Sequence, residues 1–372
     1  MCFVHVERIH FATSFSDIIK QVESIDPSKY AQSRNFLNGA VTRLSPYISR
    51  GVISTRYVFE ALKNLGYDFS DMEKLVQELA WRDYWQIIWD IKGDAIEKDL
   101  KFPQSPVRTD GVPTALLRAT TGINSIDDGL VELIETGYIH NHLRMYIASL
   151  ACNFSMCHWE IPARWMYYHL LDGDWASNTL SWQWVAGSNS SKKYYFNQEN
   201  VNKYSGSSQL HTFADVSYDA FPLASPPDAL IAVEHPKLTT VLPESNLLKL
   251  DPDLPLLIYT SYQLDPLWYS NIAANRVLLL EPSHYRKYPV SEKVIQFILQ
   301  LGENIKGLQV FTGEFADLAS AYGKSDIRYK KHPFSRYFQG KEEPAERLTT
   351  IDKDYPSFFA YWKKAQKILE FN

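Results

Sequence analysis

Two carboxylates, the amide of Asn178 and three indoles lie within the fourteen residues from Leu171 to Trp184. The set is Asp172, Asp174, Trp175, Asn178, Trp182 and Trp184. Acidic residues around a glycine usually mark a turn, and Asp174 suits the N-cap of the helix that would follow. The segment is therefore either a capped helix start with aromatic residues packed inward, or a site that joins carboxylates to aromatic surfaces.

A second group of chemically capable residues lies on the stretch 71–92, where apolar side chains recur at helical spacing. They are Leu75, Leu79, Trp81, Trp85, Ile88 and Trp89. Glu78 and Arg82 are four residues apart, so we expect them to pair on one face of this helix. The pair would be either part of a site or a surface salt bridge beside an apolar stripe.

A polar turn precedes the next candidate helix, at residues 39–47. Ser45 and Pro46 fit the N-cap and the first helical position, which would leave free backbone N–H groups at the helix start. Such groups can cradle a phosphate, although most capped helix starts bind only water.

Composition limits the function classes. The 372 residues are 45% hydrophobic, which indicates folded domains with sizeable cores. No run of about 18 apolar residues exists, and Met1 to His10 lack the pattern of a signal peptide. Three cysteines suit a reducing cytoplasm and cannot supply four thiolates for an iron–sulfur cluster, and we expect no metal site. The net charge of −5 excludes a generic polyanion binder, so any nucleic-acid contact must use a local basic patch.

The chain divides into three parts by pattern. Residues 13–37 are predicted to form a short amphipathic helix and a loop, with Asp26-Pro27-Ser28 as a helix-start signal. Further helices are predicted at 71–92, 124–136, 139–157 and 161–171, so residues 1–210 should be all-α. Prolines cluster in a connecting segment at 211–252. Residues 253–372 should form a small α/β module with a parallel sheet, with strands at 256–259, 277–280 and 308–311, a helix at 291–301 and a final helix at 355–369. Eight of the ten tryptophans lie between Trp81 and Trp184, a concentration that packing alone does not require.

Four motifs in order resemble the flavin domain of the photolyase/cryptochrome family. They are Thr42-Arg43-Leu44-Ser45-Pro46-Tyr47, Glu78-Leu79-Ala80-Trp81-Arg82-Asp83, Thr136-Gly137-Tyr138-Ile139-His140-Asn141-His142-Leu143-Arg144-Met145, and Asp172-Gly173-Asp174 through Trp184. The resemblance covers residues 25–205. It implies an all-α domain that holds FAD in a folded conformation, and a reaction in which light-excited reduced flavin passes an electron to a pyrimidine dimer in DNA.

The same resemblance implies a set of cofactor contacts. The turn 42–45 would hold the pyrophosphate. Arg144 and Asp172 would form an ion pair beside the flavin, and Asn178 would face flavin N5. The implied cofactor-binding residues are Tyr30, Thr42, Arg43, Leu44, Ser45, Glu78, Arg82, Asn141, Arg144, Asp172, Asp174 and Asn178.

The implied substrate contacts select among lesions. Trp81 and Trp184 match the indoles that sandwich a flipped-out cyclobutane dimer, and Glu78 matches the carboxyl that hydrogen-bonds it. Arg34, Asn141 and Met145 match the remaining contacts. Relatives that repair (6-4) photoproducts carry histidines at positions 141 and 145, so the resemblance favours the cyclobutane lesion.

Three departures from the family pattern stand out. Trp182 and Trp159 match the inner and middle members of its electron relay, but Leu116 occupies the outer position, where Trp165, Trp175 or a tyrosine could substitute. Val41 replaces a common hydroxyl before Thr42. We expect no α/β antenna domain before the flavin domain, where the family usually has one, and an α/β module after it instead. Because three strands are few for a chromophore pocket, we expect no second chromophore.

The resulting hypothesis is a cytoplasmic FAD enzyme that repairs cyclobutane pyrimidine dimers in blue light. Acidic charge and a missing antenna indicate weak duplex binding and a preference for single strands, where flipping is less costly. The alternatives are a cryptochrome-like photoreceptor that signals through its C-terminal module without repair, and a DNA-binding relic that no longer uses flavin.

Overall fold

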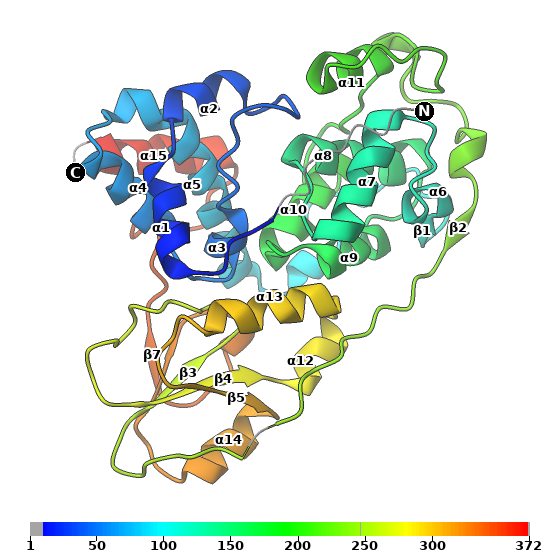
Figure 1. Ribbon diagram of the computed structural model, residues 1–372. Helices are drawn as coiled ribbons and strands as arrows, with labels where there is room; N and C mark the ends of the chain where they lie inside the picture. The colour runs from blue at the N-terminus through cyan, green and yellow to red at the C-terminus, as the bar shows by residue number, and fades with distance from the viewer. Residues whose placement is uncertain (1–9, 246, 371–372) are drawn as a thin grey trace.

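The computed structural model describes residues 10–245 and 247–370. The first nine residues, on which the prediction of no signal peptide rests, lie outside this part of the chain. Two groups of helices lie side by side above a sheet-containing module (Figure 1). The first group is α1 (Phe15–Glu23), α2 (Pro27–Ser33), α3 (Ser45–Ser49), α4 (Thr55–Asn64) and α5 (Phe69–Lys92), followed by the 3₁₀ turn Gly93–Glu97. The second is α6 (Thr114–Leu117), α7 (Asn124–Thr136), α8 (Asn141–Ser149) with a π-helical turn at Leu150–Phe154, α9 (Glu160–His169), α10 (Trp175–Ala186) and α11 (Gln198–Ser205).

The predicted helices are largely confirmed. The stretch 71–92 is α5, and 124–136 is α7. The predicted helix at 139–157 ends its regular part at Ser149, where the π-helical turn begins. The segment 13–37 holds two helices, α1 and α2, rather than one helix and a loop. The predicted helix start at Asp26 is confirmed, because its carboxylate accepts a hydrogen bond from the Lys29 backbone N–H at 3.0 Å.

The proline-rich segment runs along the outside of the second helical group to the module (Figure 1). It contains two single 3₁₀ turns, Tyr218–Ala220 and Asp228–Leu230. Its short strand β2 (Val233–Glu234) pairs antiparallel with β1 (Val112–Pro113) of the helical part. The Ser155 hydroxyl of the helical part also donates to the Leu230 carbonyl, so the segment is anchored to the second group at more than one point.

The C-terminal module is built on a five-stranded parallel sheet in the order β5-β4-β3-β6-β7. Its strands are β3 (Leu256–Tyr259), β4 (Asn275–Leu280), β5 (Leu308–Thr312), β6 (Ile327–Lys330) and β7 (Lys341–Glu343), and its helices are α12 (Pro282–Lys287), α13 (Glu292–Gly302), α14 (Phe315–Tyr322) and the 3₁₀ turn Pro333–Ser335. The prediction of a parallel sheet is confirmed, but the count of three strands is wrong. β6 alternates apolar and charged residues and β7 is a short charged edge, so neither shows the continuous apolar run of a buried strand. The strand count therefore no longer argues against a second ligand in the module.

Helix α13 lies between the sheet and the helical groups, whereas α14 covers the opposite face (Figure 1). Residues of α13 belong to one continuous apolar core that also includes α1, α3, α4 and α5. Tyr47 of α3 and Phe297 of α13 meet with ring centroids 6.2 Å apart. The sheet module and the first helical group are thus packed together rather than loosely tethered.

The last helix, α15 (Phe358–Glu370), returns from the module to pack on α5 (Figure 1). Its buried face consists of Phe358, Tyr361, Trp362, Ala365 and Leu369. A helix from the end of the chain therefore completes the first helical group. Among the described residues, no helix has both the length and the apolar character needed to cross a membrane.

Candidate functional site

Asp174 caps α10 and links it to α5. Its Oδ1 accepts a hydrogen bond from the Ser177 backbone N–H at 2.8 Å, which confirms the predicted cap. Its Oδ2 accepts one from Gln86 Nε2 at 2.6 Å and lies 3.5 Å from Arg82 Nη2. Because this carboxylate is buried and fully engaged, it fixes the relative position of a helix from each group.

Asp172 and Arg144 form a second buried link, between the turn before α10 and helix α8. Arg144 donates from Nη2 to Asp172 Oδ2 at 2.8 Å and from Nε to the Ile139 carbonyl at 3.0 Å. The Asp172 side chain is only 4% exposed, and its Oδ1 has no hydrogen-bond partner among the described residues. Removing the arginine would leave a buried carboxylate without its counter-ion.

Glu78 pairs with Arg34 rather than with Arg82. Its Oε1 lies 3.5 Å from Arg34 Nε, whereas Arg82 turns toward Asp174 and Asp83. The expected pair between Glu78 and Arg82 is therefore wrong, because buried carboxylates compete for the same guanidinium. Burial raises the pKa of Glu78, and the nearby Arg34 charge opposes that rise.

The two indoles expected to contact substrate lie on different helices. Trp81 of α5 is half-buried and stacks on Phe358 of α15, with ring centroids 3.6 Å apart and an interplanar angle of 10°. Trp184 of α10 is 39% exposed and lies 6.1 Å from the Tyr194 ring. Within the described residues, no ring contact joins Trp81 to Trp184.

The start of α8 contributes polar side chains near this region. Asn141 is its first residue and is exposed, while Met145 is half-buried one turn later. The preceding His140 is buried, and its Nδ1 accepts a hydrogen bond from the His142 backbone N–H. Burial lowers the pKa of His140 to about 4, so this imidazole is neutral at pH 7.

Asn178, Trp182 and Trp159 lie in or beside the second helical core. Asn178 Nδ2 donates to the Ala163 carbonyl at 2.9 Å, which orients the amide. Trp182 and Trp159 are each 2% exposed, and Trp159 Nε1 donates to Asp99 Oδ1 at 2.8 Å. Leu116, at the outer relay position, is fully buried in α6.

The turn before α3 differs in one detail from the expectation. Leu44 is the N-cap and Ser45 the first helical residue, so the predicted N-cap is displaced by one position. The Leu44 backbone N–H donates to Thr42 Oγ1 at 3.4 Å, and Arg43 has a left-handed φ of 53°. A non-glycine residue in this conformation is strained and is found where the surroundings hold the turn in one shape. Tyr30 of α2 is half-buried, and burial together with the Glu78 charge raises its pKa.

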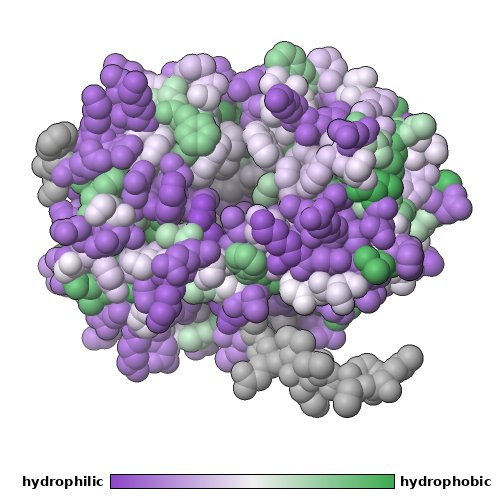
Figure 2. Space-filling view, turned by 90° about the horizontal axis from the view of Figure 1, so that it is seen from above, coloured by the Kyte–Doolittle hydropathy of each residue, from purple (hydrophilic) through white to green (hydrophobic). Residues whose placement is uncertain are grey.

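The face of the molecule seen from above is hollowed near its centre (Figure 2). In the ribbon view the two helical groups face each other at the same place, with α2 and α5 on one side and α8 and α10 on the other (Figure 1). The predicted site residues thus lie on both helical groups, on α2 and α5 of the first and on α8 and α10 of the second. Three ion pairs join predicted site residues: the expected pair of Arg144 with Asp172, and the unpredicted pairs Arg34 with Glu78 and Arg82 with Asp174.

Comparison with known proteins identifies this region. Residues 75–212 match the family described as the FAD binding domain of DNA photolyase. This part of the chain is therefore similar to the FAD domain of the photolyase/cryptochrome family. The chain is 30% identical over 174 residues to the deoxyribodipyrimidine photo-lyase of Alkalihalophilus pseudofirmus, covering 45% of this chain and 36% of that protein. It is 31% identical over 168 residues to the cryptochrome DASH of Gloeobacter violaceus, covering 42% and 33%.

A solved bacterial class III photolyase from Agrobacterium tumefaciens is also similar, with a TM-score of 0.47 and 27% identity over 52% of this chain and 42% of that one. The chain thus spans only about a third of the length of the curated relatives named above. Their similarity concerns the photolyase-type FAD domain, and the activity of the whole protein is a separate question.

The residues of the photolyase-type domain fit FAD. Several buried polar atoms have no hydrogen-bond partner among the described residues, and such atoms are rare in folded proteins. Those at the facing helices are Arg82 Nε, His140 Nε2, Asp172 Oδ1 and Ser177 Oγ. They comprise both donors and acceptors, and FAD carries the complementary phosphate, ribose and ring groups.

Sequence reasoning missed two residues that contact the predicted site residues, Gln86 and Phe358. Gln86 bonds Asp174 directly, but a glutamine on the buried side of an amphipathic helix carries no distinctive sequence signal. Phe358 reaches Trp81 from almost 280 residues away, and only the three-dimensional arrangement reveals that contact.

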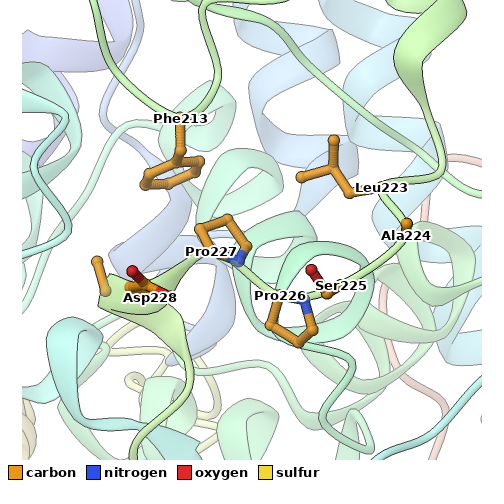
Figure 3. A pocket seen from close by; sticks show the side chains of 8 residues that line it. Phe213, Leu223, Ala224, Ser225, Pro226, Pro227 and Asp228 are labelled. Atoms are coloured by element: carbon orange, nitrogen blue, oxygen red, sulfur yellow. The ribbon is translucent and has the colours of Figure 1, made fainter.

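Two further hollows are formed by the described residues. The first lies apart from the photolyase-type site, whereas the second is lined in part by Arg82 and Gln86 of that site. One, of about 590 Å³, lies on the proline-rich segment, where Phe213, Leu223 and Pro227 face the same space (Figure 3). The other, of about 270 Å³, lies where the carboxyl ends of β3 and β6 meet the first helical group. Its cations Lys330 and Arg347 are already paired, with Asp265 at 2.6 Å and Asp90 at 2.5 Å.

Proposed function

We propose that this protein binds FAD and uses blue light to split cyclobutane pyrimidine dimers in DNA, preferentially in single strands. The observation that carries the proposal is that Glu78 and Trp81 on α5 and Trp184 on α10, two helices that pack together, all lie within the matched FAD domain. A carboxyl group and two indoles together suit a flipped-out pair of covalently linked pyrimidines, which offers carbonyl groups and ring faces.

In this proposal each cofactor contact has a defined role. Bound, reduced FAD supplies the electron on illumination. The ion pair of Arg144 and Asp172 would lie on the flavin side of the cofactor site, and the pair of Asp174 and Arg82 would hold the base of that site in place. The turn Thr42-Arg43-Leu44-Ser45, together with Tyr30, would hold the phosphate and ribose side. The Asn178 amide, oriented by the Ala163 carbonyl, faces flavin N5.

The substrate side uses a second set of residues. Trp81 and Trp184 stack on the flipped-out bases, and Asn141, Met145 and Arg34 surround them. Glu78 in its protonated form donates a hydrogen bond to a dimer carbonyl, and its raised pKa supports that role. Two carbon–carbon bonds break and the electron is returned, so the DNA undergoes no net redox change.

Trp182 and Trp159 are proposed to carry electrons that reduce the flavin. Both indoles are buried, and Leu116 is not redox-active, so the relay would need another outer donor. Trp165 lies in the same apolar core as both indoles and is the first candidate for that position. We also propose a cytoplasmic location, because the two described cysteines, Cys152 and Cys157, are free and buried.

The deciding experiment uses the FAD-loaded, chemically reduced protein and a single-stranded oligonucleotide that carries one thymine dimer. Blue light should restore the two thymines, measured by chromatography, with dark samples as the control. A Trp184→Ala variant with normal flavin content should bind the dimer more weakly. Unrestored thymines under blue light would refute the proposal, and a light-driven change in oligomeric state in the same samples would favour a photoreceptor.

A further inference from the structure

The exposed face of α15 begins next to Trp81. Phe358 is 2% exposed and stacks on that indole, whereas the following residue, Phe359, is 66% exposed. The Phe359 ring nonetheless remains close to Trp81, with centroids 6.3 Å apart and an interplanar angle of 79°. An exposed aromatic ring therefore stands beside the indole to which the proposed function assigns the flipped-out base.

Two lysines continue from Phe359 along the same side of the helix. Lys363 and Lys367 follow at intervals of four residues, which places the three side chains in one row, about 6 Å apart along the helix axis. Both lysines are exposed, and neither pairs with a carboxylate among the described residues. Lys364 is also exposed but lies about 100° around the helix from Lys363.

Charge on this helix opposes that of the whole chain. Residues 358–370 contain three lysines and one glutamate, whereas the protein carries a net charge of −5. A row consisting of an aromatic ring and unpaired cations matches the way proteins hold single strands, with bases on aromatic faces and phosphates on basic side chains. This row begins next to Trp81, the indole to which the proposed function assigns the flipped-out base.

We propose that the exposed face of α15 binds the single-stranded DNA that flanks the lesion, with Phe359 stacking on a neighbouring base and Lys363 and Lys367 contacting the phosphates. This inference rests on the proposed function for its choice of substrate. It assigns to the helix that follows the α/β module a part in binding, in addition to its part in packing.

The test measures binding in the dark, with the FAD-loaded protein and a fluorescently labelled single strand that carries a central thymine dimer. Phe359→Ala should weaken binding about 5- to 150-fold, the range for loss of one stacked base. The double variant Lys363→Gln/Lys367→Gln should reduce the slope of log affinity against log salt by about 1.4, because two phosphate contacts are lost. Lys364→Gln is the matched control and should leave both quantities unchanged.

Flank length separates this surface from the lesion pocket. Phe359→Ala should leave binding of an isolated dimer dinucleotide unchanged, because no neighbouring base is present. Phe359→Trp should restore binding of the long strand. Unchanged affinity of Phe359→Ala for the long strand, or an equal loss for the dinucleotide, would overturn the inference.

An undamaged single strand of the same length distinguishes the two proposals. If α15 is a strand-binding surface, both variants weaken binding of the undamaged strand, whether or not blue light restores thymines. If repair occurs but the variants bind both strands as the unmodified protein does, the proposed function stands and this inference fails. Flavin content and the unfolding midpoint serve as folding controls. Substitutions at these exposed positions should change neither quantity.

Discussion

The pair of Arg144 and Asp172 offers a sharp test of how the photolyase-type site is held. Arg144→Gln should lower the free energy of unfolding by about 3–5 kcal/mol, because a carboxylate that is 4% exposed loses its counter-ion. The substitution also removes the donor to the Ile139 carbonyl. The double variant Arg144→Gln/Asp172→Asn removes both charges, so it should be only about 2 kcal/mol less stable than the unmodified protein.

Urea unfolding followed by tryptophan fluorescence measures these differences for the two single variants and the double variant. The coupling free energy between the positions should be about 2 kcal/mol or more. Arg118 and Glu234 form an ion pair at the same distance of 2.8 Å but on the surface, so Arg118→Gln is a matched control, expected to change stability by less than about 1 kcal/mol. Additive effects at positions 144 and 172, within about 0.5 kcal/mol, would refute the reasoning.

Three further predictions concern titration and electron transfer. If protonated Glu78 donates to the dimer, repair should fall as the pH rises through its raised pKa, and Glu78→Gln should abolish that pH dependence; an unchanged pH–rate profile would count against the role. Trp182→Phe should suppress photoreduction, seen in the flavin absorption bands, while the chemically reduced variant still repairs; loss of that repair would contradict a relay role. The pKa of His140 is depressed from 6.5 to about 4, so its contribution to stability is complete above pH 6.5 and is lost as the pH falls toward 4. The acid-induced loss of unfolding free energy should therefore be smaller in His140→Gln than in the unmodified protein.

Sequence patterns located the long elements because local signals agreed with burial. The apolar spacing of 71–92 corresponds to α5, and the runs at 256–259 and 308–311 are strands β3 and β5. The approach failed where burial does not shape the pattern, as in the charged edge strand β7.

The candidate site shows the same division. Asp174 as a helix cap was predictable, because the residue types at a helix start follow from its free N–H groups. The partner of Glu78 was not predictable, because two arginines lie near it. Arg82 pairs with the buried Asp174, which leaves Arg34 to pair with Glu78. Phe358 on Trp81 was unpredictable in principle from local sequence, because nothing near either residue specifies the other.

The return of α15 to α5 has a consequence for synthesis on the ribosome. About 280 residues separate the end of α5 from the end of α15, which corresponds to roughly 14–56 s of translation. During that time the nascent first helical group presents an apolar face, including Tyr84 and the indole of Trp81, against which α15 later packs. Contacts between such distant residues form slowly, and exposed apolar surface attracts chaperones and other chains. The emergence of α15 is therefore the event that releases the nascent chain from this vulnerable state.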